Sequence, residues 1–260
     1  METTKPTAVA LDNATVAFRL ADNRVYTAVE QASLSVAHGE FVAIVGPTGC
    51  GKSTLLNVAA GLLKPASGAV RIFDQPLSGL NRDAGYLFQA DALFPWKTAI
   101  DNVAIGLEIK GAPRAVALER AQGWLTSVGL GAFAGRYPHM LSGGQRKRVG
   151  VARALAARPK IVLMDEPFGA LDPLTRDALG DDYRELHRKL GLTTIMITHD
   201  MTEAILLADR IAVMHGGKLL AQGTPAQLSR SGDAYVGELL RTPRRQAERL
   251  NELLPRDGAA

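Results

Sequence analysis

The chain has 260 residues, 47% of them hydrophobic and 22% charged, a composition that argues against an intrinsically disordered protein. Its net charge of +4 permits contact with acidic lipids or nucleic acid without requiring it. A single cysteine excludes a disulfide framework and a zinc site built on thiolates. The apolar runs are too short to span a bilayer, and the N-terminal residues lack the apolar region of a secretory signal.

The first predicted elements are short β-strands at residues 14–18, 41–45 and 69–73. The stretch 41–45, FVAIV, is continuously apolar, as expected of a strand that is covered on both faces of a sheet. A helix is predicted at 53–63, directly after a glycine-rich loop.

The middle of the chain differs, because no convincing strand occurs between about residues 91 and 158. Two stretches, 113–129 and 144–157, instead have helical periodicity. This arrangement predicts a helical insertion between two halves of an α/β core.

Strands return at 161–164, 194–197 and 211–214, and a helix is predicted at 173–191 after Asp172, a good N-cap residue. Alternating strands and helices indicate an α/β fold with a mostly parallel sheet.

The end of this α/β part is predicted to be a β-hairpin that turns at Gly216 and Gly217. The tail after Pro225 is short and helical.

The stretch GPTGCGKS at residues 46–53 matches the phosphate-binding pattern G-x-x-x-x-G-K-[ST], with a strand before it and a helix after it. Glycines allow backbone N–H groups to converge on phosphate oxygens, and the helix N-terminus adds the positive end of its dipole. Lys52 is predicted to reach the β- and γ-phosphates of a nucleotide, and Ser53 to bind Mg²⁺.

Adjacent carboxylates, Asp165 and Glu166, end the apolar strand at 161–164. Beside a phosphate loop, the first is predicted to bind Mg²⁺ through water and the second to polarise the water that attacks the γ-phosphate. Three other features are ambiguous alone: a surface glutamine could explain Gln89, a structural histidine could explain His199, and a plain N-cap turn could explain LSGGQ at 141–145.

Taken together, these motifs resemble the nucleotide-binding subunit of ABC transporters over roughly residues 10–225, and all six stand in that family's order. They are Walker A at 46–54, the Q-loop at Gln89, the signature LSGGQ at 141–145, Walker B at 161–165 followed by Glu166, the D-loop that ends at Asp172, and the switch histidine His199.

The resemblance implies a P-loop NTPase (RecA-like) α/β core with a parallel sheet, an N-terminal antiparallel β part and an inserted α-helical subdomain. The expected organisation is a first core half with Walker A (1–88), a helical signature subdomain (89–159), a second core half with Walker B and the switch histidine (160–225), and a short helical tail (226–260).

The resemblance also implies the ligands, ATP and Mg²⁺, and the residues that bind them. The implied catalytic residues are Lys52, Gln89, Glu166 and His199. The implied metal site is Ser53, Gln89 and Asp165. The implied nucleotide contacts are Phe18, Gly46, Pro47, Thr48, Gly49, Cys50, Gly51, Lys52, Ser53, Thr54, Gln89, Ser142, Gly143, Gly144, Gln145 and Asp172.

In this family two cassettes pack head to tail, so a homodimer is expected in which Ser142, Gly143 and Gly144 of one chain cap the γ-phosphate bound by Lys52 of the other. The loop opens a helix, so its N–H groups and dipole face an anion. An aromatic residue near the N-terminus stacks on adenine in such proteins, and Phe18 fits that place best, with Tyr26 as the alternative.

The segment LFQADALFPWKTAIDNVAIGLEIKG is similar to importers of the nitrate, sulfonate, taurine and bicarbonate group, although LSGGQRKR stands where that group commonly has LSGGMRQR. The alternatives are an osmoprotectant (glycine-betaine-type) importer and an ATPase that moves lipids or lipoproteins. The expected partners are membrane permease subunits and, indirectly, a solute-binding protein, at the cytoplasmic face of the membrane. One P-loop and a compact insertion argue against a nucleic-acid partner.

Three smaller features complete the predictions. Phe94, Pro95 and Trp96 form either local core packing or a groove for a membrane-subunit helix. Cys50, near a helix N-terminus, is expected to have a lowered thiol pKa and to react with alkylating reagents; the alternative is a buried, inert small residue at this position of the loop. The basic clusters QRKRVGVAR (145–153) and RTPRRQAER (241–249) are interpreted as solvated helix faces.

Overall fold

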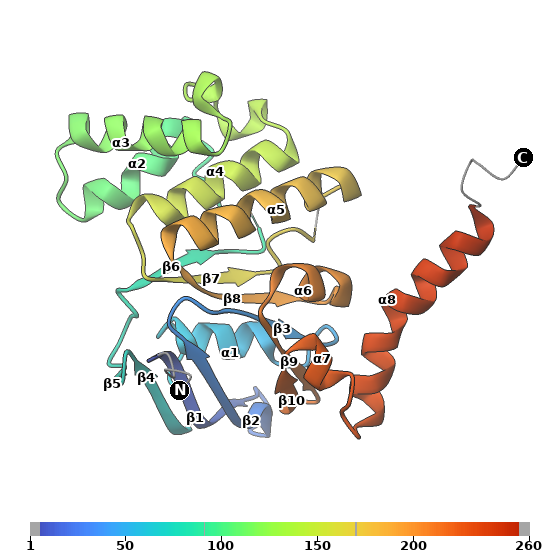
Figure 1. Ribbon diagram of the computed structural model, residues 1–260. Coiled ribbons are helices and arrows are strands. Elements are labelled where there is room, and N and C mark those ends of the chain that lie inside the picture. The colour runs from blue at the N-terminus through green and yellow to red at the C-terminus, as the bar shows by residue number, and fades with distance from the viewer. Residues whose placement is uncertain (1–5, 91, 170, 255–260) are drawn as a thin grey trace, which may run out of the picture.

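The computed structural model describes residues 6–90, 92–169 and 171–254, which form two sheets and a set of helices around them (Figure 1). The larger sheet has six strands in the order β10-β9-β3-β8-β7-β6. In that order its strands are β10 (Lys218–Gly223), β9 (Arg210–His215), β3 (Phe41–Val45), β8 (Thr193–Thr198), β7 (Ile161–Asp165) and β6 (Ala84–Leu87). All neighbours pair in parallel except β9 and β10, whose antiparallel hairpin turns at Gly216 and Gly217 as predicted.

A second sheet of four strands, in the order β2-β1-β4-β5, is antiparallel. Its strands are β2 (Val25–Ala37), β1 (Thr7–Arg19), β4 (Ser67–Ile72) and β5 (Gln75–Pro76). Strand β2 was missed by the sequence analysis, although Leu34 and Val36 alternate with exposed residues. Register shifts interrupt its pairing with β1, so the regular alternation of a half-buried strand extends over only part of it.

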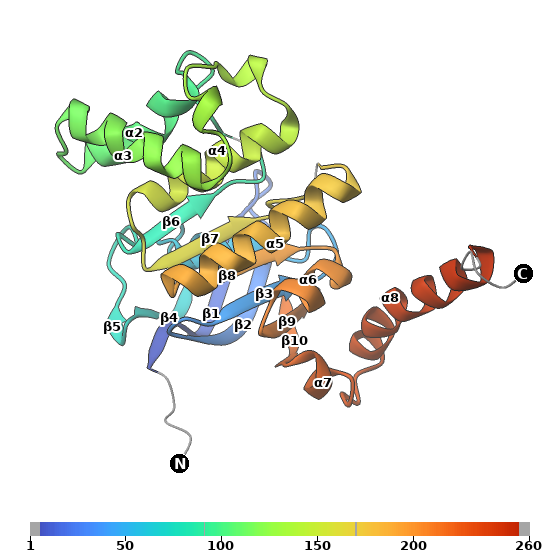
Figure 2. The ribbon, with the colours of Figure 1, turned by 45° about the horizontal axis from the view of Figure 1, so that its top comes forward.

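The helices lie on both sides of the larger sheet. They are α1 (Lys52–Ala59), α2 (Ala99–Ile109), α3 (Arg114–Ser127), α4 (Gly143–Ala156), α5 (Pro173–Leu190), α6 (Met201–Leu207), α7 (Pro225–Leu228) and α8 (Ala234–Leu253), with short 3₁₀ turns at Gly131–Phe133 and Pro138–Met140. Helix α1 lies between the two sheets, whereas α5 and α6 cover the opposite face of the larger sheet (Figures 1 and 2). Helices α2, α3 and α4 form a separate layer beyond β6 and α5.

Three apolar clusters hold these layers together. The first joins the antiparallel sheet and α1 to one face of the larger sheet, and the second joins α5 and α6 to the other face. The third lies within the helical layer, around Val103, Ala121 and Leu125. Strand β3 is buried along its whole length because both faces are covered, which explains its uninterrupted apolar sequence.

The ends of α5 follow from local chemistry. Asp172 caps its N-terminus by accepting a hydrogen bond from the backbone N–H of Thr175 at 3.0 Å, and Pro173 occupies the first turn. Gly191 ends the helix with a left-handed φ of 62°. The predicted start and end of this helix are therefore confirmed, whereas α2 was not predicted.

The C-terminal helix α8 begins against the second apolar cluster, where Val236 is buried, and its later turns project away from the rest of the molecule (Figures 1 and 2). Its arginines, including Arg244 and Arg245, are exposed, so the interpretation of this basic cluster as a solvated face is confirmed. Within the described ranges, no helix combines the length and apolar character needed to cross a membrane.

Candidate nucleotide site

The loop between β3 and α1 has a shape that only glycine permits at two positions. Gly51 has a φ of 101°, and a Cβ there would lie 2.3 Å from the backbone oxygen of Ala28. A Cβ at Gly46 would lie 2.0 Å from the backbone oxygen of Met214. No side chain caps α1, so the N–H groups of its first turn remain directed at the loop. The loop therefore has the geometry of an anion cradle.

Lys52, in the first turn of α1, is buried with 5% exposure. Its Nζ donates hydrogen bonds of 2.8 Å to the backbone oxygens of Gly46 and Pro47. These bonds curl the loop around the ammonium group, which places a positive charge inside the cradle.

Asp165 ends β7 and accepts a hydrogen bond of 3.0 Å from the hydroxyl of Ser53. Burial raises the pKa of Asp165, and the neighbouring charge of Glu166 adds to this rise, while Ser53 and Lys52 oppose it. A positive ion between Ser53 and Asp165 would relieve the cost of burying this carboxylate.

Three of the predicted residues meet at Glu166. The Nε2 of Gln89 donates to its Oε2 at 3.1 Å, and the Nδ1 of His199 lies 3.5 Å from the same oxygen. Gln89 follows β6, Glu166 follows β7 and His199 follows β8, so the parallel order of these strands brings them to one edge of the sheet.

The backbone at Glu166 is also unusual, with a φ of 43° that a non-glycine residue rarely adopts. Its N–H donates to the backbone oxygen of Ile197 at 3.0 Å, which helps to hold this conformation. A strained residue at the point where three polar side chains meet indicates a functional site.

These groups border a cavity of about 300 Å³. Its lining residues are Phe18, Tyr26, Ala28, Thr48, Gly49, Gly51, Lys52, Ser53, Thr54, Gln89 and Glu166. Phe18 and Tyr26 are partners across β1 and β2, and both are partly exposed, so either ring can cover a flat base. A flat aromatic wall, an anion cradle and a lysine fit a nucleotide.

The donor set also fits Mg²⁺. Across the described ranges, no three His, Cys, Asp or Glu side chains are grouped to hold a metal by themselves. Magnesium usually takes one or two protein oxygens and completes its shell with water and substrate phosphates. Ser53 and Asp165, 3.0 Å apart beside the cradle, offer such oxygens, and the side-chain oxygen of Gln89 is a further candidate.

The LSGGQ loop begins α4. The hydroxyl of Ser142 accepts from the N–H of Gln145 at 3.2 Å, and the Gln145 side chain accepts from the N–H of Ser142 at 3.0 Å. A Cβ at Gly144 would lie 2.5 Å from Cγ2 of Thr175, so glycine allows α5 to pack closely. Of the described residues that line the cavity, none belongs to this loop.

The expectation that the thiol pKa of Cys50 is lowered was wrong. The thiol is buried with 5% exposure, and burial raises its pKa more than Lys52 and the local backbone N–H groups lower it. The sequence shows the nearby helix N-terminus but not the packing of Cys50 against the apolar cluster beside α1.

We therefore expect iodoacetamide at neutral pH to alkylate native Cys50 at less than about a tenth of the rate seen for the unfolded chain, because little thiolate forms and the sulfur is covered. Mass spectrometry of samples taken over time, with and without guanidinium, measures both rates. Rapid native labelling that MgATP prevents would contradict this burial.

The interpretation of the first basic cluster as a solvated face was also wrong. Lys147 is buried with 3% exposure, and its Nζ donates to the backbone oxygen of Gln89 at 2.6 Å. Arg153 donates to the backbone oxygen of Ala92 at 2.7 Å. Helical periodicity alone does not show which segment covers a helix face, so these contacts could not be predicted from the sequence.

Comparison with known proteins identifies the family of this chain. The ABC transporter family model matches residues 29–169. A sulfate/thiosulfate import ATP-binding protein of Chromobacterium violaceum is 47% identical over 219 residues, 83% of this chain and 60% of that protein. A glycine betaine/carnitine/choline transport ATP-binding protein of Bacillus subtilis is 41% identical over 241 residues, 88% and 63% of the two chains. This chain thus spans about three fifths of the length of these two relatives.

Solved structures show the same fold. The dimeric post-hydrolysis ATP-binding cassette MJ0796, bound to ADP and Pi, superposes with a TM-score of 0.75 at 34% identity, over 83% of this chain and 98% of that one. CbiO1 of Clostridium perfringens, part of an ABC transporter complex, superposes with a TM-score of 0.79 at 26% identity. The match covers 96% of this chain and 97% of that one. With a glycine cradle, a carboxylate pair and these relatives, the chain belongs to the ABC transporter family and has the fold of an ATP-binding cassette.

Proposed function

We propose that this chain is the ATP-hydrolysing subunit of an ABC importer and works as a homodimer on a separate membrane permease. The observation that supports this most strongly is the meeting of Gln89, Glu166 and His199 beside the glycine cradle. The relatives named above as import or transport ATP-binding proteins support the coupling to uptake.

In the proposed reaction, Glu166 accepts a proton from the water that attacks the γ-phosphorus. The bond from the γ-phosphorus to the bridging oxygen breaks, and ADP and phosphate are released. Gln89 and His199 orient the Glu166 carboxylate, because both side chains lie beside the same oxygen. Lys52 exchanges its carbonyl partners for phosphate oxygens, which carry more negative charge. Ser53, Asp165 and Gln89 would hold Mg²⁺, which when bound would offset part of the negative charge of the phosphates.

The signature loop completes the site from a second copy. Ser142, Gly143, Gly144 and Gln145 begin a helix whose N–H groups can face an anion, yet this loop does not line the cavity of its own chain. The MJ0796 cassette was solved as a dimer. We propose that Asp172, at the start of α5, lies at the same interface. The hydrogen bonds of Asp172 with Thr175 lower the pKa of this carboxyl, so its negative form is stabilised at the start of the helix.

Mixing two inactive variants tests this shared site. Ser142→Arg and Lys52→Ala chains are each expected to lack ATPase activity. Mixed in equal amounts, they form one intact site in each heterodimer, so roughly a quarter of the parental sites should return, as for any random two-fold dimer. Phosphate release before and after mixing is the measurement.

The control is a mixture of Ser142→Arg chains with Ser142→Arg/Lys52→Ala chains, which has no intact shared site. Because hydrolysis that needs two intact sites would also leave both mixtures inactive, equal activity contradicts a loop that acts on its partner's nucleotide only when the following cross-link is absent as well. Cysteines placed at Ser53 and Ser142 in a Cys50→Ser background should also cross-link between chains if the two loops meet.

For the transported solute, we propose a small nitrate-, sulfonate- or taurine-like molecule, delivered by a solute-binding protein outside the membrane. The segment after Gln89 supports this choice. A glycine-betaine-type solute is the second candidate, supported by the 41% identity to the transporter subunit of Bacillus subtilis. With the solute-binding protein outside, we propose that this subunit lies at the cytoplasmic face of the membrane. Stimulation of ATPase activity by each solute, in the reconstituted complex, distinguishes the two.

A further inference from the structure

The segment that follows β6, described at residues 88–90 and 92–97, is held by polar contacts from two helices. From α4, Lys147 donates to the backbone oxygen of Gln89 at 2.6 Å, and Arg153 donates to that of Ala92 at 2.7 Å. The guanidinium of Arg153 also lies 5.8 Å from the centre of the Phe94 ring. Helix α4 thus contacts the segment both beside Glu166 and further along it.

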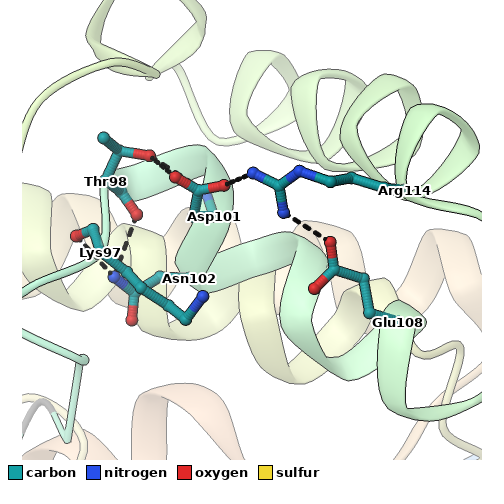
Figure 3. A network of polar contacts seen from close by, with 6 residues as sticks. All are labelled: Lys97, Thr98, Asp101, Asn102, Glu108 and Arg114. Atoms are coloured by element: carbon teal, nitrogen blue, oxygen red, sulfur yellow. Dashed lines mark hydrogen bonds and ion pairs between the residues drawn. The ribbon is translucent and has the colours of Figure 1, made fainter.

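The other end of the segment is held from α2 by Asn102, which is fully buried (Figure 3). Its Nδ2 donates to the backbone oxygens of Phe94 at 3.1 Å, Lys97 at 3.1 Å and Thr98 at 3.0 Å. Its Oδ1 accepts from the N–H of Phe94 at 2.8 Å. These bonds fix the backbone on which the Trp96 side chain is exposed.

Helix α2 is itself tied to α3 in the same network. Arg114 of α3 contacts Asp101 and Glu108 of α2, each at 2.7 Å, and Asp101 accepts from the Thr98 hydroxyl at 2.6 Å (Figure 3). The anchor at this end is therefore built into the helical layer. At the opposite end, Lys147 contacts the backbone of the residue whose side chain reaches Glu166.

We propose that Lys147 is a positioning residue for hydrolysis, which holds Gln89 against Glu166 and links it to the helix that begins with LSGGQ. This inference rests on the proposed function. Gln89 has two connections: its side chain contacts Glu166 Oε2 at 3.1 Å, and its backbone oxygen contacts Lys147 at 2.6 Å. Movement of α4 therefore shifts Gln89, and movement of Gln89 shifts α4.

The chemistry of lysine suits this role. A buried ammonium group must keep strong hydrogen bonds, because an unpaired buried charge is costly. A charge-assisted bond to a backbone oxygen is stronger than one between neutral groups. The bond of 2.6 Å to the backbone oxygen of Gln89 therefore gives this buried charge a partner directly beside the catalytic carboxylate.

The test compares Lys147→Met, which keeps the bulk but removes the donor, with Lys147→Arg, which keeps the charge. Arg148→Met is the matched control, because Arg148 lies on the same helix but pairs with Asp182 at 2.5 Å. For each variant, ATPase kcat and KM are measured. Trp96 fluorescence on addition of MgATP is measured in a Trp124→Phe background, which leaves Trp96 as the single tryptophan.

For Lys147→Met we expect kcat to fall about tenfold or more, with KM changed by less than about twofold, since a positioning contact acts on the transition state more than on binding. We also expect the Trp96 response to MgATP to disappear. Lys147→Arg should restore most of both signals, and Arg148→Met should match the parent.

If Lys147→Met has the same kcat and the same Trp96 response as the parent, the inference is overturned. The proposed function still stands in that case, because the parent hydrolyses ATP. An equal loss in Arg148→Met would also overturn it, because the effect would then be a general one on α4. If Lys147→Met does not fold, Lys147→Gln is measured by the same criteria. A parent without MgATP hydrolysis would overturn the proposed function, and this inference with it.

Discussion

Glu166→Gln should retain nucleotide binding yet lower ATP hydrolysis by about a thousandfold, in the range that removal of a general base gives. The amide has the size of the carboxylate, and its oxygen can still accept the hydrogen bond from Gln89. It has little basicity, so it cannot take the proton of the attacking water. In a site shared between two copies, bound ATP holds the copies together until it is hydrolysed, so the variant should accumulate as an ATP-bound dimer.

Phosphate release and analytical size exclusion with ATP measure the two effects. Glu185→Gln is a suitable control, because Glu185 is an exposed carboxylate on α5 outside the cavity. Equal turnover in Glu166→Gln and the parent would disprove the role of Glu166. Glu166→Gln keeps the size of the side chain, so we expect its melting temperature to stay close to that of the parent. The loss of ATP hydrolysis then cannot be attributed to unfolding.

Trp96→Ala should leave the isolated subunit stable and able to bind nucleotide, but weaken its assembly with the permease by about tenfold or more, the loss typical of an aromatic anchor at an interface. The side chain is 71% exposed, so core packing does not explain it. Exposed substitutions usually change the free energy of unfolding by about 0.5 kcal/mol or less. Thermal unfolding and a pull-down with the permease give the two measurements.

Leu62→Ala is the matched control, because Leu62 is an exposed apolar residue in the turn after α1, away from the 88–97 segment. Phe94 is a poorer probe: it is partly buried and its ring lies 5.6 Å from that of Trp96, so Phe94→Asp changes stability as well as docking. Normal assembly and normal uptake with Trp96→Ala would disprove the docking role.

Features contained in one continuous stretch could be predicted from the sequence. The glycine cradle, the cap at Asp172 and the hairpin at Gly216 and Gly217 each depend on neighbouring residues, whose backbone preferences are local. The motif order was sufficient to predict the family and the α/β core. Strand β2 was missed because its bulges break the alternation that marks a strand.

Other features were decided by the tertiary structure. Gln89, Glu166 and His199 meet because β6, β7 and β8 are adjacent and parallel, and no local pattern specifies the order of strands. Cys50 and Lys147 have the opposite surroundings to those expected, since burial depends on segments distant in the chain. Local sequence therefore determined which chemical groups this protein carries. Packing decided which of these groups are in contact, because burial and strand pairing depend on residues far apart in the chain.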